Sequence, residues 1–271
     1  MQRKRPGQSN RTVEIFGVNP VLEALRANRR AIHEITIADG VRDARLRELI
    51  ELARVHRVPV HHAPRINLDR ITGHARHQGV MARIAAAHYS EIEDLLNSVT
   101  ADAGTEEQAL FVVLDGIEDP QNLGAVLRTA ECAGVDGVFI PERRAAGLTE
   151  SVARASAGAL EHVPVARATN LSRLIDQLKE RNVWVVGTAA DARLNYTDWD
   201  WTRASAIVMG SEGVGLHRLV REHCDELVKI PVFGRIESLN VSVATGIVLY
   251  EAVRQRSLAP KESRARETAP L

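Results

Sequence analysis

The sequence predicts an α/β protein in two parts: a small N-terminal α/β domain and a C-terminal α/β domain built on a parallel sheet. Helical and strand patterns alternate along the chain, which is typical of this fold class. A polar stretch over residues 88–108 separates the two parts. Beyond it the strands are apolar almost throughout, as strands buried on both faces of a parallel sheet are.

The N-terminal domain is expected over residues 12–87. Its first helix begins where Asn19 precedes Pro20, because asparagine caps a helix and proline suits the first turn. Further elements follow in alternation: strand 32–38, helix 43–57, strand 58–62, short helix 66–72 and strand 78–85. Together they predict a small α/β unit.

The C-terminal domain is expected over residues 109–257. Five apolar segments predict its strands: 109–115, 137–141, 183–190, 206–210 and 226–232. Five helical patterns lie among them: 120–133, 149–160, 170–181, 215–223 and 238–256. Ligands of such sheets bind where the strands end, so the residues just after each strand are the first place to look for function.

The remaining segments are expected to lack regular structure. Residues 1–11 are basic with no apolar segment behind them, which indicates a disordered arm rather than a secretory signal. Residues 88–108 are interpreted as a linker, apart from a helical pattern at 91–97. Residues 258–271 show no periodicity and are interpreted as a disordered tail.

Composition sets further limits. No apolar run approaches the ~18 residues of a membrane span, so a soluble protein is expected. The two cysteines, Cys132 and Cys224, form neither a disulfide framework nor a zinc pattern. We therefore expect a cytoplasmic protein without a metal site.

The formal net charge of zero hides a difference between the two parts. Residues 1–87 carry 16 Lys/Arg and 8 Asp/Glu, whereas the remainder carries 19 and 27. This asymmetry favours an N-terminal part that contacts a polyanion such as RNA. A generally Arg-rich composition is the alternative, since 31 of the 35 basic residues are Arg, but it would enrich both parts.

Four histidines of the first part have the look of metal ligands: His61, His62, His74 and His77. No acidic or cysteine partners accompany them in a ligand pattern. We expect RNA contact or plain surface exposure for these side chains rather than metal binding.

Polar residues gather at three strand-to-helix junctions of the C-terminal domain. The first, "LDGIEDPQNLGAVLRTAECAG", carries Asn122 and Arg128 on the opening turns of a helix. The second, "IVMGSEGVGL", has Glu212 inside a Gly-rich turn. The third, "IPVFGRIESLNVS", carries Ser238 and Asn240 in front of the last helix. Capping that helix would account for Ser238 but not for Asn240, which indicates a functional role.

The Gly-rich turn does not fit a phosphate site. It lacks the Lys-Ser/Thr pair of a P-loop, and the spacing of Gly210, Gly213 and Gly215 is not G-x-G-x-x-G. Glu212 suits a cationic ligand or a hydroxyl better than a phosphate. A nucleotide-dependent oxidoreductase is therefore disfavoured. The alternative for the glycines is a tight turn that needs positive φ angles and nothing more.

The three junctions resemble, in order and content, the three motifs of the SpoU-type RNA ribose 2′-O-methyltransferases of the SPOUT superfamily. The likeness spans about residues 110–256. "FGVNPVLEAL" and "RHQGVMA" resemble the N-terminal substrate-binding domain of the same proteins. Within the family, the chain is most similar to the bacterial enzymes that methylate a guanosine of 23S rRNA, with tRNA as the alternative substrate.

The resemblance implies a deep trefoil knot in the C-terminal domain, an S-adenosylmethionine pocket formed by the knot, and a homodimer with the active site near the subunit interface. It assigns the adenosyl part of the methyl donor to backbone groups of Gly210, Ile230 and Leu239. It assigns catalysis to the polar residues Asn122, Arg128, Glu212, Ser238 and Asn240.

The implied chemistry is displacement of the sulfonium methyl group by a ribose 2′-hydroxyl. Arg128 could act as the base or, since arginine normally stays protonated, bind the neighbouring phosphate and steady the alkoxide. A non-catalytic RNA-binding factor for ribosome assembly is the rival function. Such a protein could lose Arg128, Glu212 or Asn240, and all three are present.

Overall fold

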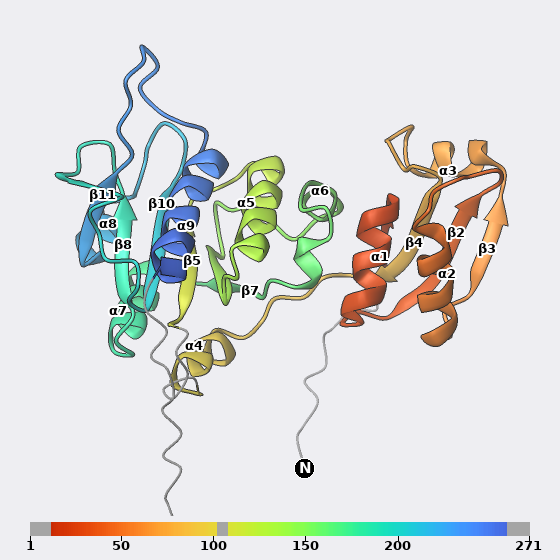
Figure 1. Ribbon diagram of the computed structural model, residues 1–271, viewed down its shortest axis with the longest axis horizontal. Helices are drawn as coiled ribbons and strands as arrows, with labels where there is room; N and C mark the ends of the chain where they lie inside the picture. Colours follow the sequence, from red (N-terminus) through yellow and green to blue (C-terminus); the bar gives the residue numbers. More distant parts are fainter. Residues whose placement is uncertain (1–11, 102–107, 259–271) are drawn as a thin grey trace, which may run out of the picture.

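The computed structural model describes residues 12–101 and 108–258. The predicted arm at 1–11, residues 102–107 of the predicted linker and residues 259–271 of the predicted tail lie outside the described residues. The chain forms two sheets, one of four strands and one of seven, in separate domains (Figure 1). The predicted fold class is confirmed in both domains. The trefoil knot stays a prediction.

The N-terminal domain holds a sheet in the order β1-β4-β2-β3. Its elements are β1 (Thr12–Phe16), α1 (Val18–Ala27), β2 (Ile32–Ala38), α2 (Leu46–Val55), β3 (Val60–Ala63), α3 (Arg65–Ile71) and β4 (Val80–Ala85). Strand β1 was not predicted. It pairs antiparallel with β4, from Thr12 opposite Ala85 to Phe16 opposite Met81, so its partner lies about seventy residues away along the chain.

His77 contradicts the expectation of RNA contact or surface exposure, because its side chain is only 2% exposed. Its Nδ1 accepts the Gly79 N–H at 3.0 Å, and its Nε2 lies 2.8 Å from Asp69 Oδ1. The ring therefore ties the loop before β4 to helix α3, and the hydrogen bond from His77 lowers the pKa of the Asp69 carboxyl. His77 is a structural residue of the domain core.

The C-terminal domain holds a sheet in the order β7-β6-β5-β10-β8-β11-β9, in which every pair is parallel. Its strands are β5 (Leu110–Asp115), β6 (Gly137–Pro141), β7 (Val165–Ala168), β8 (Trp184–Thr188), β9 (Leu194–Asn195), β10 (Ser205–Gly210) and β11 (Glu226–Lys229). Its helices are α4 (Ile92–Ala101), α5 (Pro120–Cys132), α6 (Glu150–Ala155), α7 (Leu171–Lys179), α8 (Arg218–His223) and α9 (Val241–Leu258), with a short 3-10 helix η1 (Ala159–Glu161).

Helices cover both faces of this sheet, as the apolar strands predicted. On β5, Leu110, Val112 and Leu114 join one core cluster with α5, α6 and α9. Phe111 and Val113 point to the other face, where they pack with α4, α7 and α8. Strand β5 is thus buried on two sides, which explains why its sequence shows no alternation.

Several predicted boundaries shift for local reasons. The helix predicted over 149–160 is divided into α6 and η1, because Ala157 and Gly158 adopt positive φ angles of 51° and 103°. The helix predicted to start at 215 starts at Arg218, since Gly215 also has a positive φ. Strands β7 and β9 were not predicted, and they have only four and two residues.

The segment after the N-terminal domain packs on the C-terminal one. Ser90 forms an isolated parallel bridge with Ala166 of β7. Leu95 and Leu96 of α4 are buried in the core cluster beneath the sheet. None of the described helices combines the length and apolar character needed to cross a membrane.

Helix α5 lies directly against α6 at Gly124. A β-carbon at Gly124 would stand 2.3 Å from Ala155 Cβ and 2.9 Å from the Ala155 carbonyl carbon. Gly246 of α9 also lies inside a helix, but a β-carbon there would be 3.5 Å from Thr129 Cγ2, an ordinary contact. The two helical glycines therefore differ in what surrounds them.

We expect Gly124→Ala to lower the free energy of unfolding by about 1–2 kcal/mol, because the clash with backbone outweighs the better helix propensity of alanine. Gly246→Ala, the matched control, should raise it by about 0.5–1 kcal/mol. Chemical denaturation of both variants measures the difference. Equal effects would contradict the close α5–α6 contact.

Candidate active site

The candidate site is built on three loops that leave the carboxyl edge of the large sheet. Strands β5 and β10 are hydrogen-bonded neighbours, with Asp115 opposite Gly210 at their ends. Parallel strands end at one edge, so the loops that follow them are close in space. The loop after β11 is the third, and it projects beyond the rest of the domain (Figure 1).

The first loop places Asn122 on the opening turn of α5. Asp119 caps this helix, accepting the Gln121 N–H at 2.9 Å, and Pro120 occupies the first helical position. Asp115 before the loop is 4% exposed. Its carboxylate accepts the His217 backbone N–H at 2.7 Å and lies 3.0 Å from His217 Nδ1. This buried carboxylate ties the end of β5 to the residue that follows the Gly-rich turn.

The Gly-rich turn after β10 is a small closed loop. Ser211 and Gly215 exchange two backbone hydrogen bonds, of 3.1 and 2.9 Å. Gly213 and Gly215 have φ angles of 84° and 72°, so the expectation of a tight turn with positive φ holds for these two. Gly210 is required for another reason, since a β-carbon there would lie 2.2 Å from the Gly215 carbonyl carbon. The turn presents Glu212 at its tip.

Glu212 joins the three loops. Its Oε1 accepts hydrogen bonds from Asn122 Nδ2 at 3.1 Å, from Asn240 Nδ2 at 2.8 Å and from the Val241 backbone N–H at 3.4 Å. Asn240 Nδ2 also donates to Asn122 Oδ1 at 2.9 Å. The structure thus brings together three of the five predicted catalytic residues in one hydrogen-bonded cluster.

Asn240 also caps helix α9, which corrects the expectation that capping would involve Ser238. Its Oδ1 accepts the Ser242 backbone N–H at 2.9 Å, the Ser242 hydroxyl at 2.6 Å and the Val243 N–H at 3.4 Å. One amide group therefore serves two purposes, with its oxygen on the helix and its nitrogen on Glu212. Ser238 lies two residues earlier in the exposed loop, outside the cluster.

Two of the three predicted donor-binding residues, Gly210 and Leu239, lie close in the chain to residues of this cluster. Gly210 lies two residues before Glu212, and Leu239 lies directly before Asn240, so the hydrogen bonds of the cluster hold both near one point. Ile230 follows β11, which is separated from β10 by one strand, β8. Every residue from 231 to 240 is exposed, including Leu239 at 39%.

Arg128 stands apart from the cluster. It lies six residues after Asn122, about 9 Å along α5 and about 120° around its axis. Its side chain is exposed, and no other described residue forms a hydrogen bond or ion pair with it. Burial raises the pKa of the Cys132 thiol one turn later, and the nearby Arg128 cation opposes that rise. The guanidinium is thus free to bind an anion from outside.

The site shows no sign of a metal. The described residues contain no group of three or more His, Cys, Asp or Glu side chains that could hold a metal ion. Glu212 has amide and backbone N–H groups around it rather than further acids. A single carboxylate among amide and backbone N–H groups suits an organic cation or a hydroxyl.

Comparison with known proteins identifies the family. The model of the SpoU rRNA methylase family matches residues 109–250, and the model of the RNA 2′-O ribose methyltransferase substrate-binding domain matches residues 15–90. YacO of Bacillus subtilis (strain 168), named as a TrmH-family tRNA/rRNA methyltransferase, is 44% identical over 244 residues, which cover 90% of this chain and 96% of YacO. A protein of the same designation from Staphylococcus haemolyticus is 43% identical, with the same coverage.

Solved structures agree with this assignment. The SpoU methyltransferase AviRb from Streptomyces viridochromogenes has a TM-score of 0.74 at 25% identity, covering 91% of this chain and 90% of AviRb. An AdoMet-bound rRNA methyltransferase from Sinorhizobium meliloti has a TM-score of 0.73 at 26% identity, covering 90% and 87%. The chain belongs to the SpoU family of RNA methyltransferases, as its three junctions predicted.

The double role of Asn240 gives a test of the cluster. Asn240→Ala should lower the free energy of unfolding by about 1–2 kcal/mol through loss of the cap. Asn240→Asp keeps the capping oxygen but places a carboxylate beside Glu212 Oε1, which raises the pKa of the introduced carboxyl in the folded state. A raised folded-state pKa means stability that is present at low pH and lost as pH rises through that pKa.

Urea denaturation at pH 7.5 and pH 4.5 distinguishes the variants. Relative to wild type, the deficit of Asn240→Asp should shrink at the lower pH, while that of Asn240→Ala should stay nearly constant. A pH-independent deficit for Asn240→Asp would contradict the contact between Asn240 and Glu212.

Proposed function

We propose that this protein transfers a methyl group from S-adenosylmethionine to a ribose 2′-hydroxyl of RNA. The carrying observation is the Asn122–Glu212–Asn240 cluster, which unites the three family motifs at one edge of the sheet. Within the family we favour a guanosine of 23S rRNA, as in the bacterial RlmB subgroup. A tRNA ribose is the second candidate, because the YacO relative is named for both tRNA and rRNA.

The cofactor proposal rests on the chemistry of the site and on solved relatives. AviRb has been solved in complex with AdoMet, and the Sinorhizobium protein is AdoMet-bound. S-adenosylmethionine has no phosphate and carries a sulfonium cation, so a nearby carboxylate such as Glu212 favours it. Backbone groups at Gly210, Ile230 and Leu239 would contact its adenosyl part.

In the proposed reaction, the ribose 2′-oxygen attacks the methyl carbon, the carbon–sulfur bond breaks with its electron pair passing to sulfur, and the hydroxyl proton passes to solvent water. Asn122, Glu212, Ser238 and Asn240 form the polar wall on the donor side. Arg128 acts on the RNA side, where it binds the neighbouring phosphate and stabilises the negative charge that develops on the 2′-oxygen. Its guanidinium is exposed and pairs with no other residue in the described part of the chain, so it is available for this role.

We further propose that the active protein is a homodimer that meets through the edge around the third loop. In the third loop Phe233 is 97% exposed and Ile236 is 77% exposed, and on α9 Val243 and Tyr250 are 52% and 50% exposed. Large exposed apolar side chains such as these indicate an interface. A second copy covering them would enclose the donor site at the subunit boundary.

The N-terminal domain is proposed to bind the RNA. Its match to a substrate-binding domain and its excess of basic residues support this role. An RNA substrate would also favour the cytoplasm. The rival function, a non-catalytic assembly factor, would bind RNA without using the methyl donor.

The cofactor assignment is tested by thermal shift. S-adenosylmethionine or its demethylated product, at about a hundred times its Kd, should stabilise the fold by about 2.7 kcal/mol and raise Tm. NAD and ATP share the adenosine but carry phosphates, and they should leave Tm unchanged. Stabilisation by NAD without stabilisation by the methyl donor would overturn the assignment.

Arg128 is tested by single-turnover methylation of saturating RNA with labelled donor. Arg128→Ala should slow methyl transfer by ~10²-fold, the usual loss for one positioned electrostatic group, while donor affinity stays the same. Arg128→Lys should be nearly as slow, because lysine lacks the planar fork that holds two oxygens. Arg173→Ala, which removes an exposed arginine on α7, is the matched control and should leave the rate unchanged. Wild-type rates in Arg128→Ala would refute this role.

A further inference from the structure

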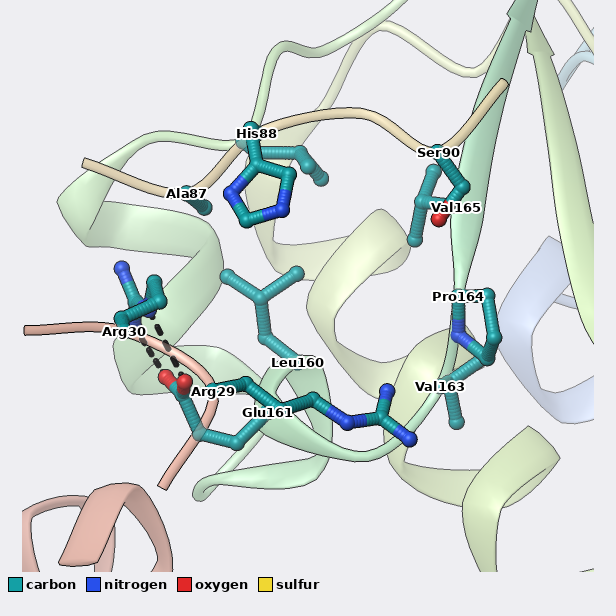
Figure 2. Close-up of a pocket in the computed structure, with 11 residues that line it drawn as sticks. Arg29, Arg30, Ala87, His88, Ser90, Leu160, Glu161, Val163, Pro164 and Val165 are labelled. Atoms are coloured by element: carbon teal, nitrogen blue, oxygen red, sulfur yellow. Dashed lines mark hydrogen bonds and ion pairs between the residues drawn. The ribbon is translucent and has the colours of Figure 1, made fainter. Parts of the chain in front are cut away.

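A buried ion pair joins the two domains. Arg30 comes from the turn between α1 and β2, and Glu161 ends the 3-10 helix η1 of the C-terminal domain. Their side chains are only 6% and 4% exposed. Arg30 Nε donates to Glu161 Oε2 at 2.9 Å, and Arg30 Nη2 donates to Glu161 Oε1, so the guanidinium grips both carboxylate oxygens (Figure 2).

The third nitrogen of this guanidinium, Nη1, connects the pair to another segment of the chain. Arg30 Nη1 donates to the carbonyl of Ala85, the last residue of β4, at 3.1 Å. The Arg30 guanidinium thus donates a hydrogen bond from each of its three nitrogens, two to Glu161 and one to Ala85, and is held in one orientation. It borders a cavity of about 70 Å³ that is also lined by His88 and Ser90 of the connecting segment (Figure 2).

The neighbouring residue makes a second connection between the domains. His162 Nε2 lies 2.9 Å from Glu23 Oε2 of α1, and the His162 carbonyl accepts a hydrogen bond from Arg29 Nη1 at 3.0 Å. Two consecutive residues of the C-terminal domain are therefore held by α1 and the turn after it.

Apolar packing leaves little room at this junction. Ala153 of α6 belongs to the core cluster of the N-terminal domain. Gly158 has a φ of 103°, and a β-carbon there would lie 2.7 Å from Glu23 Cβ. The segment from α6 to η1 is thus packed into the N-terminal domain rather than resting on its surface.

The same segment contacts the helix that carries the candidate catalytic residues. Gly124 of α5 lies against Ala155, the last residue of α6, and Ser156, which follows it. Asn122 is two residues before Gly124 on the same helix. Helix α6 lies between α1 and α5 (Figure 1), so packed segments connect Arg30 through Glu161 and α6 to the opening turns of α5.

We infer that Arg30 and Glu161 are positioning residues, which hold the N-terminal domain in one orientation relative to α5 so that RNA bound on that domain reaches the methyl donor. This inference rests on the proposed function. Methyl transfer requires the attacking oxygen within about 3–3.5 Å of the methyl carbon, and a misplacement of about 1 Å can cost ~10²-fold in rate. A buried bidentate pair resists tilting and sliding in a way that apolar contact does not.

The test compares two variants that break the pair differently. Glu161→Gln leaves the buried Arg30 charge unpaired. The change lowers the free energy of unfolding and weakens the contact that fixes the orientation of the N-terminal domain. The double variant Arg30→Met with Glu161→Leu replaces the pair with apolar side chains of similar size, which often restores stability without the directional bonds. Glu222→Gln breaks the exposed Arg218–Glu222 pair on α8 and is the matched control.

For each protein, Tm, donor Kd, RNA Kd and the single-turnover rate at saturating RNA are measured. We expect Glu161→Gln and the double variant to keep donor Kd within about two-fold and to slow methyl transfer by ~10-fold or more. The double variant should do so with a Tm close to wild type. A wild-type rate in the double variant would show that the pair only stabilises the fold, and the inference would be wrong.

Hydrogen–deuterium exchange gives an arm that does not depend on activity. Backbone amides over residues 28–32 and 153–163 should exchange faster in Glu161→Gln and in the double variant than in wild type or Glu222→Gln. Unchanged exchange there would overturn the inference. If the wild-type protein transfers no methyl group to RNA, the proposed function fails, and exchange alone then decides whether the pair holds the domains together.

Discussion

One carboxylate oxygen of Glu212 holds the candidate site together. It accepts hydrogen bonds from Asn122, Asn240 and Val241, which belong to the loops after β5 and β11, while Glu212 itself follows β10. Asn122 and Asn240 are 118 residues apart in the chain. Without this shared acceptor, the tip of the Gly-rich turn would lose its hydrogen bonds to the other two loops, which would then be joined by the Asn240–Asn122 bond alone.

The parallel sheet makes such a meeting point possible. Strands β5 and β10 end side by side, and buried Asp115 fixes the turn between β10 and α8 from beneath. Glycines at positions 210, 213 and 215 let the turn close tightly enough to present Glu212 toward α5 and α9. The Glu212 side chain is therefore positioned by backbone geometry, and its carboxylate can interact with a ligand.

Helix α5 links the candidate site to the N-terminal domain. Its first turn contributes Asn122 to the cluster, its third carries Arg128, and Gly124 between them packs on the segment that enters the N-terminal domain. A displacement of the N-terminal domain would press on the helix that shapes the site. The N-terminal domain, which is proposed to bind the RNA, and the candidate site of the C-terminal domain are thus connected through one helix.

Most of this architecture could be predicted from local sequence. Uniformly apolar runs identified five strands of the large sheet. The Asn19–Pro20 signal located α1 to within two residues, although Gly17 and not Asn19 occupies its N-cap position. Strands β1, β7 and β9 were not predicted. Such short strands form because they pair with residues distant in the chain, as Thr12 does with Ala85.

The site was predictable in identity but not in detail. The three motifs indicated Asn122, Glu212 and Asn240, yet no local pattern could show that Asn240 caps α9 while also binding Glu212. Likewise, the burial of His77 depends on Asp69 and Gly79, which fold around it. The Arg30–Glu161 pair spans 131 residues and left no periodic signal at all.

The most direct test of the central claim is to find where the transferred methyl group resides. The protein is incubated with RNA and S-adenosylmethionine labelled in its methyl group, and the RNA is then hydrolysed in alkali. A 2′-O-methyl group blocks cleavage at its own nucleotide, so the account predicts label in an alkali-resistant dinucleotide that contains a 2′-O-methylribose. Label released on a base, or no transfer by protein that binds the donor, would contradict it.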